Sequence, residues 1–84
     1  MGMTVDIEVF GQLVDLMGGT RHSVELSERH CTVGEATAQL AREIPALEPA
    51  LSSIAYAIGD RVVRRDEPLH DGQTLVLLAP VSGG

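Results

Sequence analysis

The residues with the clearest chemical potential stand at the end of the sequence, where Pro80-Val81-Ser82 is followed by Gly83 and Gly84. Glycine has no side chain, so two consecutive glycines can enter a channel that is too narrow for any other residue. An apolar strand precedes this segment. The pattern predicts a projecting arm that carries its reactive group, the carboxylate of Gly84, at the tip.

The remaining residues offer no competing active site. His22, His30 and His70 do not have the spacing of metal ligands, and Cys31 has no second cysteine to join it. We therefore interpret the histidines as solvated loop residues and expect no metal site. Cys31 precedes a predicted helix start, where a thiolate is favoured, but no base is identified that could activate it. We interpret it as a partly buried or incidental thiol.

Composition limits the classes of function. The chain has 84 residues, enough for one domain, and a formal net charge of -6. This acidity argues against nucleic acid as a partner; it suits a partner with a basic groove, or simply keeps the protein soluble. No apolar run is long enough to cross a membrane, and a single cysteine fits a cytoplasmic location. All six cations are arginines, so lysine-linked chains of this protein are excluded.

The first part of the chain predicts a strand, a short helix and a second strand. Apolar residues alternate over 4–9, take helical spacing over 12–17 and alternate again over 22–26. Gly18-Gly19 ends the short helix. We expect the second strand to pair antiparallel with the first.

The middle of the chain predicts the main helix. Thr32 and Glu35 fit a capping box, and one apolar stripe follows as far as Ile44, where Pro45 ends the helix. The segment 46–53 is expected to form one or two loose turns.

Three more strands are predicted over 54–58, 61–64 and 74–78. Gly59-Asp60 is the turn of a hairpin between the first two. Leu69 is expected to anchor the following loop to the core.

Two strands, one helix and three strands predict an α+β fold of the β-grasp, ubiquitin-like type. A hairpin cannot hide its apolar face alone, so the helix must cover one face of a mixed sheet of about five strands. The last strand can lie beside the first and parallel to it. We expect a domain over 1–79 and a tail over 80–84. Alternate residues of 75–78 would form an apolar patch on the open face, unless Leu13, Leu16 and Met17 fold over it.

The two ends of the chain resemble one known family. Asp71-Gly72-Gln73-Thr74, an apolar strand and Ala79-Pro80-Val81-Ser82-Gly83-Gly84 are similar to the "DGDEV…PPVSGG" ending of the ubiquitin-like sulfur carriers, and the segment 5–18 is similar to their first strand and "FAxxRExxG" motif. The resemblance is greatest to the small subunit of molybdopterin synthase, the MoaD type. It spans nearly the whole chain and implies the same β-grasp fold.

The resemblance also implies a function in molybdopterin (molybdenum cofactor) biosynthesis. An E1-like adenylyltransferase would use ATP to adenylate the C-terminal carboxylate, and sulfur transfer would give a thiocarboxylate. The thiocarboxylate would donate its sulfur to a precursor in the larger catalytic subunit of the synthase. The carrier would bind no cofactor and would not be catalytic alone. By this resemblance Gly84 carries the sulfur, Gly83 passes the channel, Pro80, Val81 and Ser82 keep the arm extended, and Phe10, Leu75 and Leu77 are candidates for the docking patch.

Three alternatives remain open at this point. The carrier could serve thiamine thiazole or cysteine biosynthesis. The protein could instead be a ubiquitin-like modifier that is attached to other proteins through Gly84. Finally, it could be a non-covalent interaction module in which the two glycines are incidental.

Overall fold

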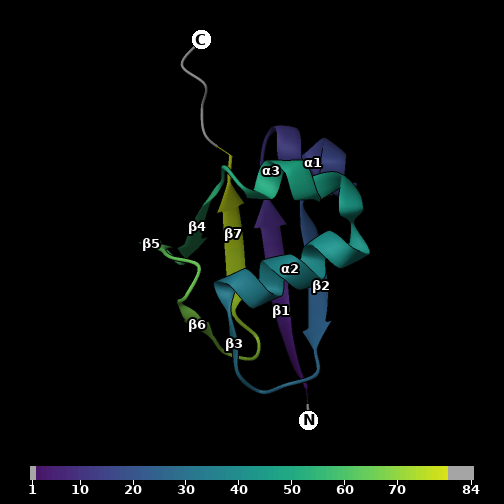
Figure 1. The fold of residues 1–84 in the computed structure, drawn as a ribbon. Helices are drawn as coiled ribbons and strands as arrows, with labels where there is room; N and C mark the ends of the chain where they lie inside the picture. The colour runs from purple at the N-terminus through teal and green to yellow at the C-terminus, as the bar shows by residue number, and fades with distance from the viewer. Residues whose placement is uncertain (1, 80–84) are drawn as a thin grey trace.

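The computed structural model describes residues 2–79, and its strands and helices follow the periodicities of the sequence. Figure 1 shows their arrangement. In chain order the elements are β1 (Met3–Val9), α1 (Gln12–Met17), β2 (Arg21–Leu26), β3 (Cys31–Thr32), α2 (Val33–Glu43), the 3-10 turn η1 (Pro45–Leu47), α3 (Glu48–Leu51), β4 (Ala55–Ile58), β5 (Arg61–Val63), β6 (Pro68–Leu69) and β7 (Thr74–Leu78).

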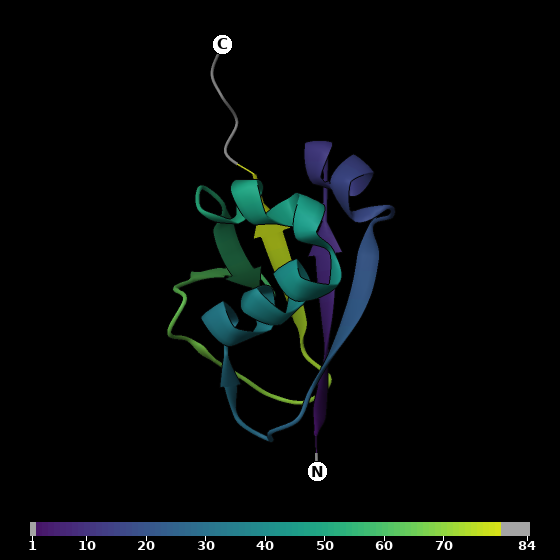
Figure 2. The same ribbon diagram turned by 45° about the vertical axis from the view of Figure 1, so that its right-hand side comes forward.

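Five of the strands form one mixed sheet in the order β2-β1-β7-β4-β5. The two central strands, β1 and β7, are parallel, and every other neighbouring pair is antiparallel. The helix α2 lies across one face of this sheet (Figures 1 and 2). This is the predicted arrangement, including the parallel pairing of the last strand with the first.

A turn before β7 fixes its position beside β1. Asp71 Oδ1 accepts a hydrogen bond of 2.7 Å from the Thr4 amide, and the Gly72 amide donates one of 2.8 Å to the Thr4 carbonyl. Gly72 has a φ of 85°, a conformation that side chains strongly disfavour. The Asp-Gly pair therefore aligns the start of β7 with β1.

The N-terminus of α2 has the predicted capping box. The Glu35 amide donates to Thr32 Oγ1 at 3.2 Å, and the Thr32 amide donates to Glu35 Oε1 at 2.9 Å. Two further amides at this end are bound by carbonyls from the loop before β6, since Val33 donates to Glu67 and Gly34 to Arg65. These bonds hold α2 in place against the loop.

The core lies between α2 and the sheet and is aliphatic, as the scarcity of aromatic residues predicts. Its largest fully buried side chains are Ile7, Leu13, Leu40, Leu47, Leu69, Leu75, Leu77, Val5, Val9, Val24 and Val33. Within the described residues, no buried side-chain nitrogen or oxygen lacks a hydrogen-bond partner. No helix of residues 2–79 is long and apolar enough to cross a membrane.

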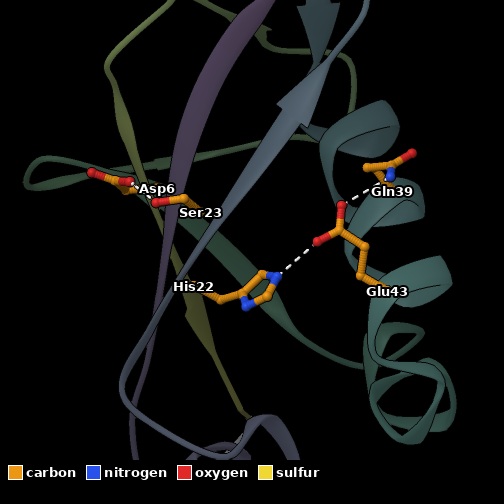
Figure 3. Close-up of polar contacts among 5 residues, drawn as sticks. All are labelled: Asp6, His22, Ser23, Gln39 and Glu43. Carbon is orange, nitrogen blue, oxygen red and sulfur yellow. Dashed lines mark hydrogen bonds and ion pairs between the residues drawn. The ribbon is translucent and has the colours of Figure 1, made fainter.

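The edge strand β2 is joined to α2 by a polar contact that the sequence did not indicate. His22 Nε2 lies 2.7 Å from Glu43 Oε1, and Gln39 Nε2 donates to Glu43 Oε2 at 2.9 Å. Figure 3 shows His22 pointing towards α2 while the next residue, Ser23, points away from it. The interpretation of His22 as a solvated loop residue is therefore wrong: it lies in a strand and bonds the main helix.

Two other local predictions need correction. The sequence shows no strand pattern in the polar connection 27–31 or in the loop 65–68, but Cys31 pairs with Leu69 and Thr32 with Pro68 in a small two-stranded sheet. The alternation of apolar and polar residues cannot reveal a strand of two residues, because it is recognised only over about four residues or more. The loose turns after α2 are present, and Pro49 falls in the first turn of α3, where its missing amide costs nothing.

The Glu43 contact predicts a pH-dependent term in stability. Hydrogen bonds from Gln39 and then from His22 lower the pKa of Glu43 below its ordinary value of 4.5. A lowered pKa stabilises the folded state above the pKa of the unfolded chain, and the effect is lost as pH falls through the folded pKa. Relative to Glu43→Gln, the native chain should be more stable by a few tenths of a kcal/mol near neutral pH, because the site is partly exposed.

Urea unfolding of the native chain and of Glu43→Gln, from neutral pH to below the pKa of Glu43, measures the difference in their free energies of unfolding. The advantage of the native chain should shrink below pH 4.5. A difference that stays constant through this range would show that the Glu43 carboxylate makes no net contribution. Glu25→Gln is a matched control, because Glu25 lies on the same strand as His22 and is exposed.

Candidate functional site

The end of β7 and the end of β1 lie at the same edge of the sheet, because the two strands are parallel and Val9 pairs with Leu77. Phe10, which follows β1, is 53% exposed, and Leu78 at the end of β7 is 37% exposed. The described chain leaves the sheet here at Ala79. The tail residues Pro80, Val81, Ser82, Gly83 and Gly84 lie outside the described residues, so their predicted roles stay predictions.

Two of the predicted docking residues are in the core instead. Leu75 and Leu77 have no exposed surface, and both belong to the main hydrophobic cluster under α2. Their alternation with Thr74, Val76 and Leu78 follows from the period of two in a strand. Because the run 75–78 is apolar throughout, the sequence does not show which of its alternate residues face the core. Leu75 and Leu77 face the core, so their prediction as docking residues is wrong.

The apolar residues of β7 that alternate with Leu75 and Leu77 belong to an apolar patch on the open face of the sheet. Val76 pairs with Ala57 on β4, Ala57 pairs with Val62 on β5, and Leu78 pairs with Ala55. Directly paired residues point to the same face of a sheet. We call Ala55, Ala57, Val62, Val76 and Leu78 the open-face patch. Val62 is its most accessible member, with 69% of its surface exposed.

The other half of the open face, on β1 and β2, is polar. Ser23 Oγ donates to Asp6 Oδ1 at 2.6 Å, as Figure 3 shows, and Arg21 Nε lies 3.6 Å from Glu8 Oε2. Glu8 pairs with Val76, so charged and apolar residues meet along the centre of the sheet. An apolar patch with a polar border on one side is the usual composition of a protein-binding surface.

The helix α1 does not cover this patch. Leu13 and Met17 are buried in the main hydrophobic cluster, and Leu16 is 42% exposed. Figure 1 shows α1 at the end of the sheet, beside α3. The alternative prediction, in which these three residues fold over the open face, is therefore wrong.

Cys31 has the opposite character to a reactive thiolate. It is buried, with 6% of its surface exposed. Burial raises the pKa of its thiol, and the nearby Glu35 carboxylate raises it further. The expectation that the helix start would favour the thiolate is wrong, because burial and the Glu35 carboxylate both raise the pKa of the thiol. Among residues 2–79, no group of histidine, cysteine and carboxylate residues could hold a metal ion.

Ala57 and Val62 belong to the patch, although the sequence did not predict them as candidates. Ala57 is buried, with 7% of its surface exposed, but it is not in the core cluster, because it faces away from α2. Pairing through the Gly59-Asp60 turn sets Val62 opposite Ala57 and Val63 opposite Tyr56. Working out this register from the hairpin turn could have assigned Val62 to the open face.

Comparison with known proteins places the chain among small β-grasp proteins. The ThiS family model matches residues 7–84. SAMP1 from Haloferax volcanii superimposes with a TM-score of 0.86 and 26% identity, over 96% of this chain and 99% of that one. Its fold, a mixed sheet grasping one main helix, is the fold that the sequence predicts.

Two further solved structures have the same fold. A putative molybdopterin converting factor subunit 1 from Pyrococcus furiosus matches with a TM-score of 0.81 and 21% identity, over 94% of this chain and 99% of that one. A chain in the complex of subunits 1 and 2 of the molybdopterin-converting factor from Helicobacter pylori matches with a TM-score of 0.66 and 24% identity, over 98% of this chain and 100% of that one.

The assignment of the two sheet faces predicts different costs for substitutions on β7 and β5. Leu77→Ala should lower the free energy of unfolding by about 2–5 kcal/mol, because it leaves a cavity in the core. Val62→Ala should change it by no more than about 0.5 kcal/mol, because Val62 is largely solvated. Chemical denaturation of both variants measures this. Equal destabilisation by the two substitutions would contradict the assignment.

Proposed function

The chain belongs to the ThiS family of ubiquitin-like sulfur carriers, and from this premise we propose that it carries sulfur on its C-terminal Gly84 for molybdopterin biosynthesis. The observation that carries the proposal is the placement of the Gly-Gly sequence. In the sequence it follows the central strand β7 by a few residues, and β7 itself ends close to Phe10 and the open-face patch, which offer apolar surface to a partner.

The proposed chemistry begins with activation, because a carboxylate is a poor electrophile. On an E1-like adenylyltransferase, a Gly84 carboxylate oxygen attacks the α-phosphorus of ATP, and pyrophosphate leaves. A hydrosulfide-level donor then attacks the carbonyl carbon. The bond to the AMP oxygen breaks, AMP leaves, and a thiocarboxylate remains. No electrons are transferred in either step. The carrier binds no cofactor of its own, and ATP is bound by the activating enzyme.

Donation takes place on a second protein. The thiocarboxylate sulfur attacks an electrophilic carbon of the precursor and displaces an oxygen leaving group from it. Water then hydrolyses the acyl–sulfur bond, which returns the Gly84 carboxylate and leaves the sulfur on the precursor as a thiolate. The catalytic groups for this step belong to the larger subunit of the synthase. The carrier contributes the sulfur, a side-chain-free approach through Gly83 and a surface for docking.

The open-face patch supports docking of such a subunit. Val62 and Leu78 are exposed apolar side chains, and they lie on strands that also carry Ala55, Ala57 and Val76. Ala55 is small and exposed, so a partner side chain can approach the sheet closely there. Burial of this surface would provide affinity while the tail reaches the reaction centre.

Two observations favour the molybdopterin pathway over other uses of a sulfur carrier. The ending Pro80-Val81-Ser82-Gly83-Gly84 is similar to that of the molybdopterin synthase small subunit. The fold also matches a chain from the complex of subunits 1 and 2 of the Helicobacter pylori molybdopterin-converting factor. That complex is a precedent for a larger partner subunit.

A second candidate function is that of a protein modifier joined to other proteins through Gly84. It is favoured by the match to SAMP1, a small archaeal modifier protein. This chain has no lysine, so one copy could not be joined to a lysine of another copy. Such a modifier could therefore be attached to a target lysine only as a single copy. Covalent adducts of the chain with other proteins would distinguish this function from sulfur donation.

The proposal predicts a specific covalent state of the C-terminus. The intact mass of the protein isolated from its own cells should show the exchange of one oxygen for one sulfur. Deletion of Gly84 leaves a carboxylate on Gly83, one residue short of the position that the native carboxylate reaches. It should therefore abolish both this exchange and ATP-dependent adenylation without changing the fold. A deletion variant that is still adenylated and still donates sulfur would refute the proposal.

The docking role of the open-face patch gives a separate prediction. Val62→Asp should weaken binding to the larger synthase subunit by about 10-fold or more, because it places a charge in a desolvated contact. Ala38→Asp is the matched control, since Ala38 is exposed on α2, on the other side of the molecule from the patch. Titration calorimetry with the purified subunit measures both. Equal affinities for the two variants would exclude the patch as the docking surface.

A further inference from the structure

A pocket that takes no part in the open face lies at the point where the described chain leaves the sheet. It has a volume of about 210 Å³ and is formed between α1 and the α3 segment. Gln12 and Leu16 contribute from α1, Ala50 from α3, and Ser53 and Ile54 from the chain that leads to β4. Ala79, at the end of β7, completes the wall.

The size of the pocket decides what class of occupant fits it. Pockets for drug-sized molecules and cofactors have volumes of roughly 300–1,000 Å³. At about 210 Å³ this pocket is smaller than that range and open on one side, which suits one large side chain of another protein. Leu13 and Leu16 supply an apolar wall, and Leu16 is partly accessible from outside, with 42% of its surface exposed.

The charges around the pocket indicate the character of that protein. None of the lining residues is charged, although the chain has 18 aspartate, glutamate, lysine and arginine residues, six of them basic and twelve acidic. The helices α1 and α3 carry one charge each, Asp15 and Glu48; both are acidic and exposed. An uncharged pocket between two acidic helices is complementary to an apolar side chain set in a basic surface.

The position of the pocket relates it to the chemistry of the tail. Ala79 lines the pocket, and Gly84 is five residues further along the chain. Five extended residues span at most about 18 Å, so any protein that encloses the Gly84 carboxylate must lie within this distance of the pocket. In the proposed reaction the activating enzyme must bring this carboxylate to the α-phosphorus of ATP, so it has to hold the chain close to Ala79 while the tail is in its active site.

We infer that this pocket receives an apolar side chain from a basic surface of the ATP-dependent enzyme that activates Gly84. This inference rests on the proposed function and deepens it, because it gives the activating enzyme an anchor distinct from the open-face patch. An anchor beside Ala79 holds the root of the tail in a fixed position, so that fewer conformations of the tail must be lost when the carboxylate reaches ATP.

The test is ATP–pyrophosphate exchange by the purified adenylyltransferase of the same organism, with the full-length chain as substrate. Ser53→Phe fills the pocket from a position that is exposed in the free protein. It should raise the KM for the carrier by about 10-fold and leave kcat nearly unchanged, because the anchor affects binding and not the reacting atoms. Ala38→Phe on α2 is the matched control and should behave as the native chain.

A second variant tests the same site without filling it. Leu16→Ser removes an apolar wall of the pocket and should also raise the KM for the carrier. A further variant, Asp15→Asn combined with Glu48→Gln, removes the acidic charges and should reduce the dependence of this KM on salt. Circular dichroism and thermal unfolding check that each variant is folded. The binding of each variant to the larger synthase subunit is measured in parallel.

The outcomes separate this inference from the proposed function. If the native chain is not adenylated, the proposed function fails, and the inference fails with it. If the native chain is adenylated and folded Ser53→Phe and Leu16→Ser have its KM, the inference alone is overturned. If these variants lose affinity only for the larger subunit, the pocket belongs to that partner, which also overturns the assignment to the activating enzyme.

Discussion

The parallel pairing of β1 with β7 is the constraint on which the rest of the structure depends. It places the last strand in the centre of the sheet, where Leu75 and Leu77 are fully buried between β1, β4 and α2. A parallel neighbour also forces both strands to end at the same edge. Phe10, which follows β1, and Ala79, which precedes the tail, are therefore brought to the same end of the sheet, although most of the chain separates them. The hydrogen bonds from Asp71 and Gly72 to Thr4 set the register of this pair.

A central position also makes the last strand a stable base for a reactive tail. An outermost strand of a sheet can detach with the loss of only one set of hydrogen bonds, but β7 is hydrogen-bonded to a strand on each side. Pulling on the tail would have to break pairings with β1 and β4 together. A partner that binds the tail would therefore not disturb the packing of the core.

The two faces of the sheet and its end have separate tasks. One face builds the core with α2, and the open face divides into a polar half on β1 and β2 and the apolar patch on β7, β4 and β5. The uncharged pocket between α1 and α3 lies at the end of the sheet. The sulfur carrier that we propose would meet two enzymes in succession, and it would need surfaces that both can use around one tail. Two apolar surfaces that adjoin the same tail root satisfy this requirement in a chain of 84 residues.

The sequence by itself determined the five strands of the main sheet, the main helix and the fold class. The period of two in Val5, Ile7 and Val9, the capping box of Thr32 and Glu35, and the hairpin turn at Gly59-Asp60 are local signals, and the structure confirms each of them. The tertiary structure alone decided which face of β7 is buried. Because Leu75-Val76-Leu77-Leu78 is apolar throughout, only pairing with Val9 and Tyr56 assigns Leu77 to the core. The contact of His22 with Glu43, the open-face patch and the pocket beside Ala79 likewise join residues from separate elements, and no local pattern encodes such contacts.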